Sequence, residues 1–249
     1  QRMLVAKFHF EEDNIVLLKN EEATKTSIIQ EFSNITKKAG GNDRVLIFFA
    51  GHGETETLGI EGGDMGFLIP ADGDPEDLYF TAIPMDELRR ISNWSKAKHM
   101  RFLVDACYGG LTLSTRGLGK EQTPEYLQKM TKEKGRQVIT AGGKDEQVME
   151  KAEWGHSAFT KNLISGLKNE LADANDDGII SGEELGIFIR DGVIIDTESQ
   201  HTPQKGRIGS DVGEFVFISK TLENEVAMVN TGGGEEMDGI KEQMAAQQK

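Results

Sequence analysis

This chain contains one cysteine, five prolines and two tryptophans among 249 residues, and the scarcity of cysteine excludes an intrachain disulfide framework. A chain without disulfides is typical of a reducing compartment, so we expect a cytoplasmic protein. No apolar run approaches the roughly 20 residues that span a bilayer, so we expect no membrane partner. Basic residues are also scarce, since 28 Lys and Arg against 42 Asp and Glu give a formal net charge of −14. Such a surface repels the phosphate backbone, which excludes nucleic acid as the expected partner, and it attracts cationic ligands.

The apolar run at 44–50 predicts a strand that is covered on both faces, as in a parallel sheet, and 102–104 and 136–141 are expected to form further strands. Between the strands, apolar residues recur at helical spacing, as Ile28 and Phe32 do. This alternation predicts an α/β fold in layers, a mostly parallel sheet flanked by helices. The sequence further predicts an edge strand at 14–18, a Gly-rich acidic loop after His52, one helix within 111–135, helices at 84–92, 157–171 and 185–195, and a last strand at 213–218.

Two of the predicted strands end in a reactive side chain flanked by small residues. RVLIFFA (44–50) runs into Gly51-His52-Gly53, and the strand within RFLVDACYGG (101–110) delivers Cys107. In an open α/β sheet, sites form outside the carboxyl ends of the strands, so we expect Cys107 and His52 to be neighbours. An adjacent imidazole activates a thiol as a nucleophile. A lone cysteine is more often an inert buried side chain, so the prediction depends on the two motifs together.

AGHG after one apolar strand and DACYGG about 50 residues further on resemble the motifs of caspase-like cysteine peptidases. That clan includes caspases, metacaspases, paracaspases and bacterial caspase-like proteins. The resemblance runs from about residue 14 to 218 and includes GFLIPAD, RQVITAGGKDE, GHSAFTKNL, HTPQ and GEFVF. It implies a caspase-like three-layer sandwich and an endopeptidase that acts on proteins or peptides through an acyl-enzyme. By this resemblance Cys107 attacks the scissile carbonyl, His52 protonates the leaving amine, and the backbone N–H groups of Gly53 and Cys107 form the oxyanion hole.

Asp105 is expected beside the nucleophile, because alternate residues of a strand share a face and Asp105 precedes Cys107 by two. The resemblance implies that Asp at this position, as in metacaspases and paracaspases, binds a basic side chain, whereas caspases carry Gln. Arg can pair with a carboxylate through two hydrogen bonds, so we expect cleavage after Arg, then Lys, and not after Asp. Ala50 is expected to line the same pocket, with a second acidic wall from the segment before residue 14. The alternative is that Asp105 caps a nearby turn or helix.

The preference for basic residues has an internal consequence. Arg116, Lys120 and Lys134 lie in a polar segment after the nucleophile, where family members are often processed. Self-cleavage in this segment is therefore a further hypothesis.

DANDDGIISGEE (173–184) fits the twelve-residue EF-hand loop, in which hard oxygen ligands bind Ca²⁺. The alternative is a degenerate loop that only connects two helices. Four other acids, which are weaker candidates for a second calcium site of the kind that metacaspases often need, are Asp64, Asp72, Asp74 and Asp145. The predicted ligands of the EF-hand-like loop are Asp173, Asn175, Asp177, the carbonyl of Ile179, Ser181 and Glu184, with Gly178 at the turn.

The family domain normally opens with a central strand and a helix, and residues 1–13 resemble only the end of that unit, so we expect the N-terminal strand to be missing. We expect a peptidase domain over 1–218, with the loop 173–184 inserted between helices. Residues 219–249 are expected to form an acidic tail or linker, toward a regulatory domain or partner chain. Two other interpretations stay open: a catalytically silent scaffold or calcium-binding module, and a thiol hydrolase of small molecules.

Overall fold

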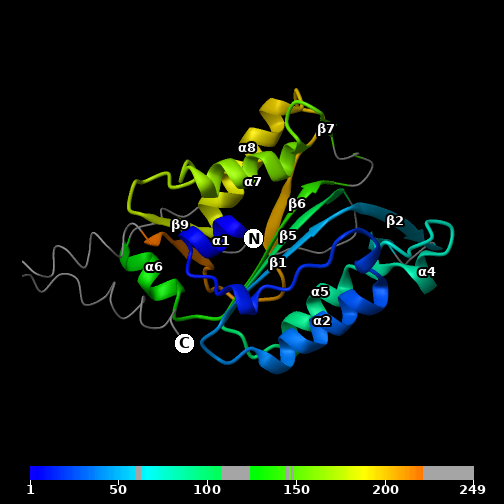
Figure 1. The fold of residues 1–249 in the computed structure, drawn as a ribbon, viewed down its shortest axis with the longest axis horizontal. Helices are drawn as coiled ribbons and strands as arrows, with labels where there is room; N and C mark the ends of the chain where they lie inside the picture. The colour runs from blue at the N-terminus through cyan, green and yellow to red at the C-terminus, as the bar shows by residue number, and fades with distance from the viewer. Residues whose placement is uncertain (60–62, 108–123, 144–145, 147–148, 221–249) are drawn as a thin grey trace, which may run out of the picture.

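The computed structural model of the chain describes residues 1–59, 63–107, 124–143, 146 and 149–220 (Figure 1). Its centre is a four-stranded sheet with the strand order β1-β5-β6-β10. The first three strands are parallel, and the last is antiparallel to β6. This confirms the expected α/β fold with a mostly parallel sheet. The strands are β1 (Arg44–Ala50), β5 (His99–Cys107), β6 (Gly135–Gly142) and β10 (Gln204–Arg207).

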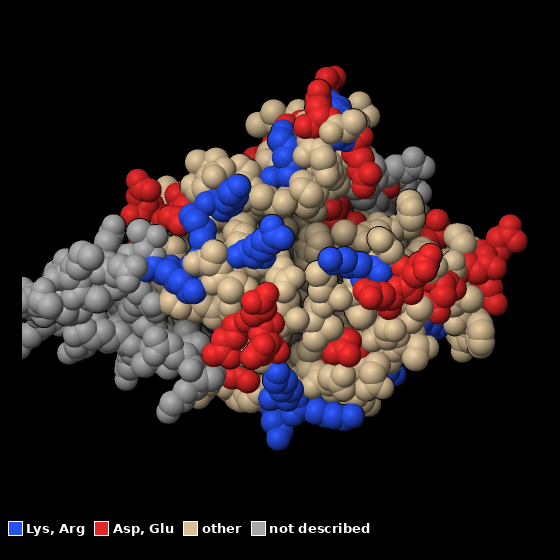
Figure 2. All heavy atoms as spheres, viewed as in Figure 1, with Lys and Arg blue, Asp and Glu red and all other residues tan. Residues whose placement is uncertain are grey.

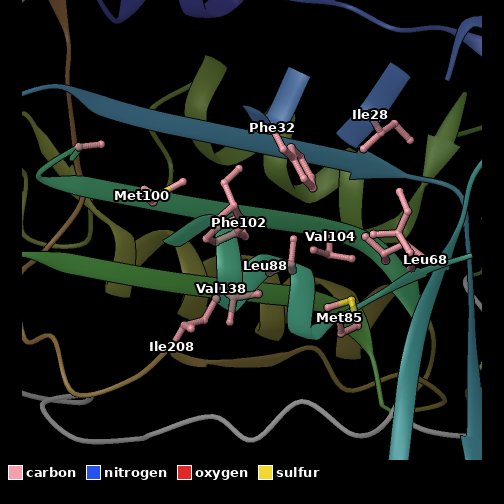
Figure 3. Close-up of a cluster of buried hydrophobic side chains, with 14 of the residues drawn as sticks. Ile28, Phe32, Leu68, Met85, Leu88, Met100, Phe102, Val104, Val138 and Ile208 are labelled. Atoms are coloured by element: carbon pink, nitrogen blue, oxygen red, sulfur yellow. The ribbon is translucent and has the colours of Figure 1, made fainter. Parts of the chain in front are cut away.

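Helices cover both faces of this sheet, as Figure 1 shows. Alternate residues of a strand point to opposite faces, so Phe102 and Val104 of β5 enter one core while Leu103 enters the other. Figure 3 shows the first core, in which Phe102 and Val104 pack with Leu88 from a covering helix. The first face is covered by α2 (Lys25–Lys38) and α5 (Asp86–Trp94), and the second by α1 (Arg2–Lys7), α7 (Ala158–Lys168) and α8 (Gly182–Asp196).

A second sheet begins where the first ends, and here the prediction of a loop after His52 was wrong. The segment forms a hairpin of β2 (His52–Leu58) and β3 (Gly63–Ile69), which is followed by the short helix α4 (Leu78–Thr81) and by β4 (Ile83–Pro84), paired with β3. The glycines and acids suggested a loop, but Thr55 and Thr57 suit a pleated strand and stand opposite Gly66 and Asp64 in the register.

The predicted edge strand at 14–18 was also wrong. Two 3-10 turns, η1 (Glu12–Asn14) and η2 (Asn20–Glu22), flank an extended stretch whose ends, Ile15 and Lys19, have φ/ψ values of −103°/115° and −123°/140°. The backbone has the conformation of a strand, but no strand in the described ranges pairs with it. A strand is defined by its ladder of hydrogen bonds, which a pattern of side chains cannot supply.

The remaining elements are short. The segment 111–135 contains the expected helix, and the last strand pairs antiparallel with a short strand inside the predicted calcium loop. None of the helices in the described ranges has the length and apolar character needed to span a membrane. These elements are α6 (Pro124–Met130), β7 (Glu150–Lys151), β8 (His156–Ser157), β9 (Ile179–Ser181) and β11 (Val216–Ile218).

Candidate active site

The two strands with reactive ends are direct neighbours in the sheet. β1 and β5 pair in parallel register, with Ala50 opposite Asp105. One residue further on, the N–H of Gly51 donates to the carbonyl oxygen of Asp105 at 3.2 Å. His52 follows at once and begins β2, which contacts β5. The structure therefore brings His52 to the end of the sheet where the backbone of Cys107 closes β5, as the sequence predicted.

The expected dyad and oxyanion hole lie partly outside the described residues. His52 is exposed, and half-buried Gly53 stands opposite Leu68 in the β2–β3 hairpin. The side chain of Cys107 and residues 108–110 lie outside the part that the structure describes. The distance between the thiol and the imidazole thus stays a prediction.

β5 does not run regularly to its end. Val104 stands opposite Thr140 of β6 and Cys107 opposite Gly142, so three steps on β5 match two on β6. Such a bulge bends a strand and redirects the side chains after it. The expectation that Asp105 and Cys107 share a face simply because they are two residues apart therefore does not apply through this bulge.

Asp105 is one of the few acidic side chains buried in the fold, with an exposure of 4%. Its Oδ2 accepts hydrogen bonds from the hydroxyl of Ser157 and, at 2.5 Å, from that of Thr160. Its Oδ1 is buried and has no hydrogen-bond partner in the described ranges. Burial raises the pKa of the Asp105 carboxyl, and the charge of Glu150 adds to the increase, whereas the two hydroxyls and His156 act in the opposite direction.

The alternative role of Asp105, as a cap, is met only in part. Its carboxylate lies at the first turn of α7, but the residue that caps this helix is Ser157, whose Oγ accepts from the N–H of Thr160 at 2.9 Å. Asp105 instead accepts hydrogen bonds from the side chain of this cap residue and from that of Thr160 in the first turn. Ala50 is its in-register neighbour on β1, and the pocket that the two were expected to line stays a prediction.

Sequence reasoning missed Ser157 and Thr160 as members of this site. Both hydroxyls reach Asp105 from more than 50 residues along the chain, at separations of 52 and 55. The only available signal was the segment GHSAFTKNL, which includes both residues and contributed to the resemblance without a role.

The predicted calcium loop connects α7 to α8, and its carboxylates accept hydrogen bonds from backbone N–H groups of the same loop. Asp173 accepts from the N–H groups of Asp177 (3.2 Å) and Gly178 (2.8 Å), and Gly178 has the positive φ of 77° expected at the turn. At the far end, Glu184 accepts from the N–H groups of Ser181 (2.9 Å) and Ala174 (3.3 Å). The loop thus folds around its own carboxylates.

Two carboxyls of this loop have raised pKa values, mainly because they are buried. Burial raises the pKa of Asp177, with a further increase from the charge of Asp173. Burial likewise raises the pKa of Glu184, and Asp177 adds to it. In the described ranges no group of three or more His, Cys, Asp or Glu side chains is gathered for a metal ion. The predicted set also uses Asn175, Ser181 and a backbone carbonyl, all oxygen donors of the kind that Ca²⁺ accepts.

The weaker calcium candidates have other partners. Asp64 accepts from Thr57 at 2.8 Å, Asp72 from the N–H of Lys25 at 2.7 Å, and Asp74 from the N–H of Glu76 at 2.9 Å. Asp145 lies outside the described residues. Figure 2 shows acidic side chains spread over the end of the molecule that carries the hairpin and α4, rather than gathered at one point.

Comparisons with known proteins agree with this architecture. The model of the Caspase domain family matches residues 1–234. The crystal structure of protein GSU0716 from Geobacter sulfurreducens, a structural-genomics target, is similar with a TM-score of 0.52 at 17% identity, over 79% of this chain and 78% of that one. At this identity the likeness concerns the fold alone. A search of curated protein sequences finds no match.

Proposed function

This chain belongs to the caspase domain family of cysteine peptidases, and from that premise we propose that it is an endopeptidase that cleaves after Arg and, less well, after Lys. The observation that supports this specificity is the buried carboxylate of Asp105, a residue that precedes Cys107 by two. One oxygen of this carboxylate has no hydrogen-bond partner in the described ranges. A buried, unpaired carboxylate is costly unless a cation binds it. A basic substrate side chain supplies that cation.

The proposed reaction uses residues at the carboxyl end of the sheet. The sulfur of Cys107 attacks the scissile carbonyl carbon while its proton passes to His52. The N–H groups of Gly53 and Cys107 stabilise the oxyanion, which forms only on the way through the tetrahedral intermediate. The C–N bond then breaks, His52 protonates the leaving amine, and water hydrolyses the thioester to release the acid and the thiol.

The test is a panel of fluorogenic peptides that differ only before the scissile bond, with Arg, Lys, Asp or Leu, in calcium and in chelator. We expect turnover of the Arg and Lys peptides and a loss of at least about 1000-fold in Cys107→Ala, because the nucleophile is removed. Asp-selective turnover would contradict the proposed role of Asp105 but would still support peptidase activity. Absence of turnover with a folded protein would favour a catalytically silent scaffold or calcium-binding module.

Self-processing is part of the proposal, and the contacts of Lys134 bear on which bond we expect to be cut. Lys134 precedes β6, and its carbonyl accepts from the N–H of Gly213 at 2.7 Å. A side chain at Gly213 would lie 2.0 Å from the carbonyl oxygen of Glu133, so this backbone is tightly packed. A protease needs an extended, accessible strand, so we expect cleavage after Arg116 or Lys120, which lie outside the described residues, and not after Lys134.

Intact mass spectrometry before and after incubation tests this prediction. The wild-type protein should yield two fragments whose masses place the cut at Arg116 or Lys120, and Cys107→Ala should stay intact. An unchanged mass in a protein that cleaves the Arg peptide would contradict self-processing. A cut at Lys134 would contradict the protection inferred from Gly213.

We further propose that the loop 173–184 binds Ca²⁺ through the oxygen atoms predicted from its sequence. Burial, with a smaller contribution from neighbouring acids, raises the pKa values of Asp177 and Glu184, and a cation bound between the carboxylates favours their charged forms. A ligand present at 100 times its Kd stabilises a protein by about 2.7 kcal/mol, which corresponds to an increase in Tm of roughly 5–10 °C at this chain length.

Thermal unfolding in calcium, magnesium and chelator measures this effect. Wild type should gain stability with calcium and much less with magnesium, and Asp177→Asn should lose the gain because it removes a ligand charge. Asp191→Asn, an exposed acid of α8 outside the loop, is the matched control and should respond as wild type. An equal shift in Asp177→Asn, or none in wild type, would contradict calcium binding at this loop.

A further inference from the structure

The two oxygens of the Asp105 carboxylate have different surroundings. Oδ2 accepts hydrogen bonds from the hydroxyls of Ser157 and Thr160, both from the start of α7. A carboxylate oxygen offers about two lone-pair sites, so these two donors fill Oδ2. Oδ1 is buried and has no hydrogen-bond partner in the described ranges.

The groups around Asp105 do not neutralise it. Among the described residues no Lys, Arg or His forms an ion pair with its carboxylate. The charged groups that act on it are Glu150 of β7, which is unfavourable to the anion, and His156 of β8, which is favourable when protonated. Neutral hydroxyls therefore hold the carboxylate, and the described residues supply no counter-ion for it.

We propose that Ser157 and Thr160 are positioning residues that occupy Oδ2 and present a single carboxylate oxygen, Oδ1, to the substrate cation. This inference rests on the proposed function, since it takes Asp105 to bind the basic side chain. It concerns how Asp105 distinguishes Arg from Lys, and it changes the size of the preference that the sequence led us to expect. The advantage of Arg over Lys was expected to come from two parallel hydrogen bonds to both carboxylate oxygens.

With Oδ2 filled, a guanidinium loses one of those two bonds, and an ammonium reaches Oδ1 equally well. A hydrogen bond to a charged group contributes about tenfold or more to affinity. We therefore expect Arg to be preferred over Lys by less than about tenfold. A pocket with both oxygens free would separate the two residues by more than that.

Thr160 is the better residue to change, because Ser157 has a second role as the N-cap of α7. The described hydrogen bond of the Thr160 hydroxyl goes to Asp105 alone. Thr160→Val keeps the shape and removes this donor, which frees a lone pair on Oδ2. Thr160→Ser restores a hydroxyl, and Ser165→Ala removes a half-buried hydroxyl further along the same helix as a control.

The experiment measures binding without turnover. Two acetylated tetrapeptide acids that differ only in a C-terminal Arg or Lys are titrated calorimetrically into Cys107→Ala protein, alone and combined with each change on α7. Measurements at pH 8 and again with His156→Gln keep the titration of that imidazole out of the comparison. Unchanged Tm values show that each variant is folded.

We expect an Arg-to-Lys affinity ratio below about tenfold in the parent, a rise of at least threefold in Thr160→Val, and a return toward the parent value in Thr160→Ser. A large ratio in the parent, or a ratio that Thr160→Val leaves unchanged, would overturn the inference. Binding of neither peptide would overturn both the inference and the basic specificity. If Cys107→Ala protein binds the basic peptides selectively but the wild-type protein does not cleave them, the peptidase function would be wrong and the inference would still hold.

Discussion

Replacing Asp105 by Asn is expected to lower kcat/KM for an Arg peptide by about 100-fold, because the amide keeps the shape of the carboxylate and removes its charge. Turnover of a Leu peptide, if the wild-type protein has any, should change little. The same charge makes activity toward basic peptides fall on acidification. Since burial raises the pKa of Asp105, this fall should occur at a higher pH than for an exposed Asp.

The same substitution should not cost stability. A carboxyl whose pKa is raised above its usual value of 3.8 binds a proton more readily in the folded state than in the unfolded state. The free energy of unfolding therefore decreases as the pH rises from about 4 through the raised pKa. Asn does not titrate, so Asp105→Asn should be at least as stable as wild type at pH 8 and lack this decrease.

Asp191→Asn is the matched control, since Asp191 is an exposed acid of α8 that pairs with the adjacent Arg190. It should leave both activity and stability unchanged. Peptide kinetics and urea unfolding of the three proteins distinguish the possibilities. Full activity toward Arg peptides in Asp105→Asn would refute the cation pocket, and a marked loss of stability would indicate a structural role instead.

The second large effect concerns a buried ion pair far from the candidate nucleophile. Arg207 of β10 and Glu214 lie 2.8 Å apart, and each is 1% exposed. The second oxygen of Glu214 accepts from Gln137 of β6 at 2.8 Å and from the N–H of Glu183, in the first turn of α8, at 3.0 Å. One carboxylate thus connects two strands and the start of a helix.

Glu214→Gln should lower the free energy of unfolding by about 3–5 kcal/mol, because it leaves the buried guanidinium without a counter-charge. The effect extends to Arg101, which is also buried and on which Glu214 acts favourably. Burial lowers the pKa of Arg101 to about 10, with Arg207 acting in the same direction and Glu214 and Glu183 in the opposite one. Urea unfolding measures the change, and the near-isosteric Gln keeps cavity formation out of the comparison.

Arg207→Met combined with Glu214→Leu provides the control. Replacing both partners by apolar residues removes the unpaired charge, so the double variant should be less destabilised than either single change. A loss below about 1 kcal/mol in Glu214→Gln would contradict the assignment of this pair as a principal link between sheet and helix.

The sequence predicted those parts of the fold whose signal is local. The run RVLIFFA gave β1 with its observed bounds. The expectation that both faces of this strand are covered was wrong, because β1 lies at the edge of the sheet and Phe48 is 47% exposed. The stripe that includes Ile28 and Phe32 gave α2, and Thr24 caps that helix, with its hydroxyl oxygen accepting from the N–H of Ser27 at 3.1 Å. Cys107 and His52 were placed at one end of the sheet because parallel neighbours carry their ends to the same edge.

Features that depend on distant partners were not predictable in this way. Residues 14–18 have the apolar pattern and extended backbone of a strand but no described ladder partner, so the pattern alone misled. The bulge before Cys107 arises from pairing with β6 and leaves no mark in the residues of β5. The hydroxyls on Asp105 come from a helix that begins more than 50 residues later, and no local rule connects them.

The position of α7 has a thermodynamic consequence. Its first turn holds the Asp105 carboxylate, its last turn leads into the loop 173–184, and its 11 residues span roughly 16 Å between them. Asn162, midway along, donates to Asp196 of α8 at 2.7 Å and fits against Gly192, so the helix pair is firmly joined. Calcium could therefore alter peptide affinity only at a distance, and such coupling is reciprocal. Whatever factor calcium contributes to the binding of a basic peptide, the peptide contributes equally to the binding of calcium.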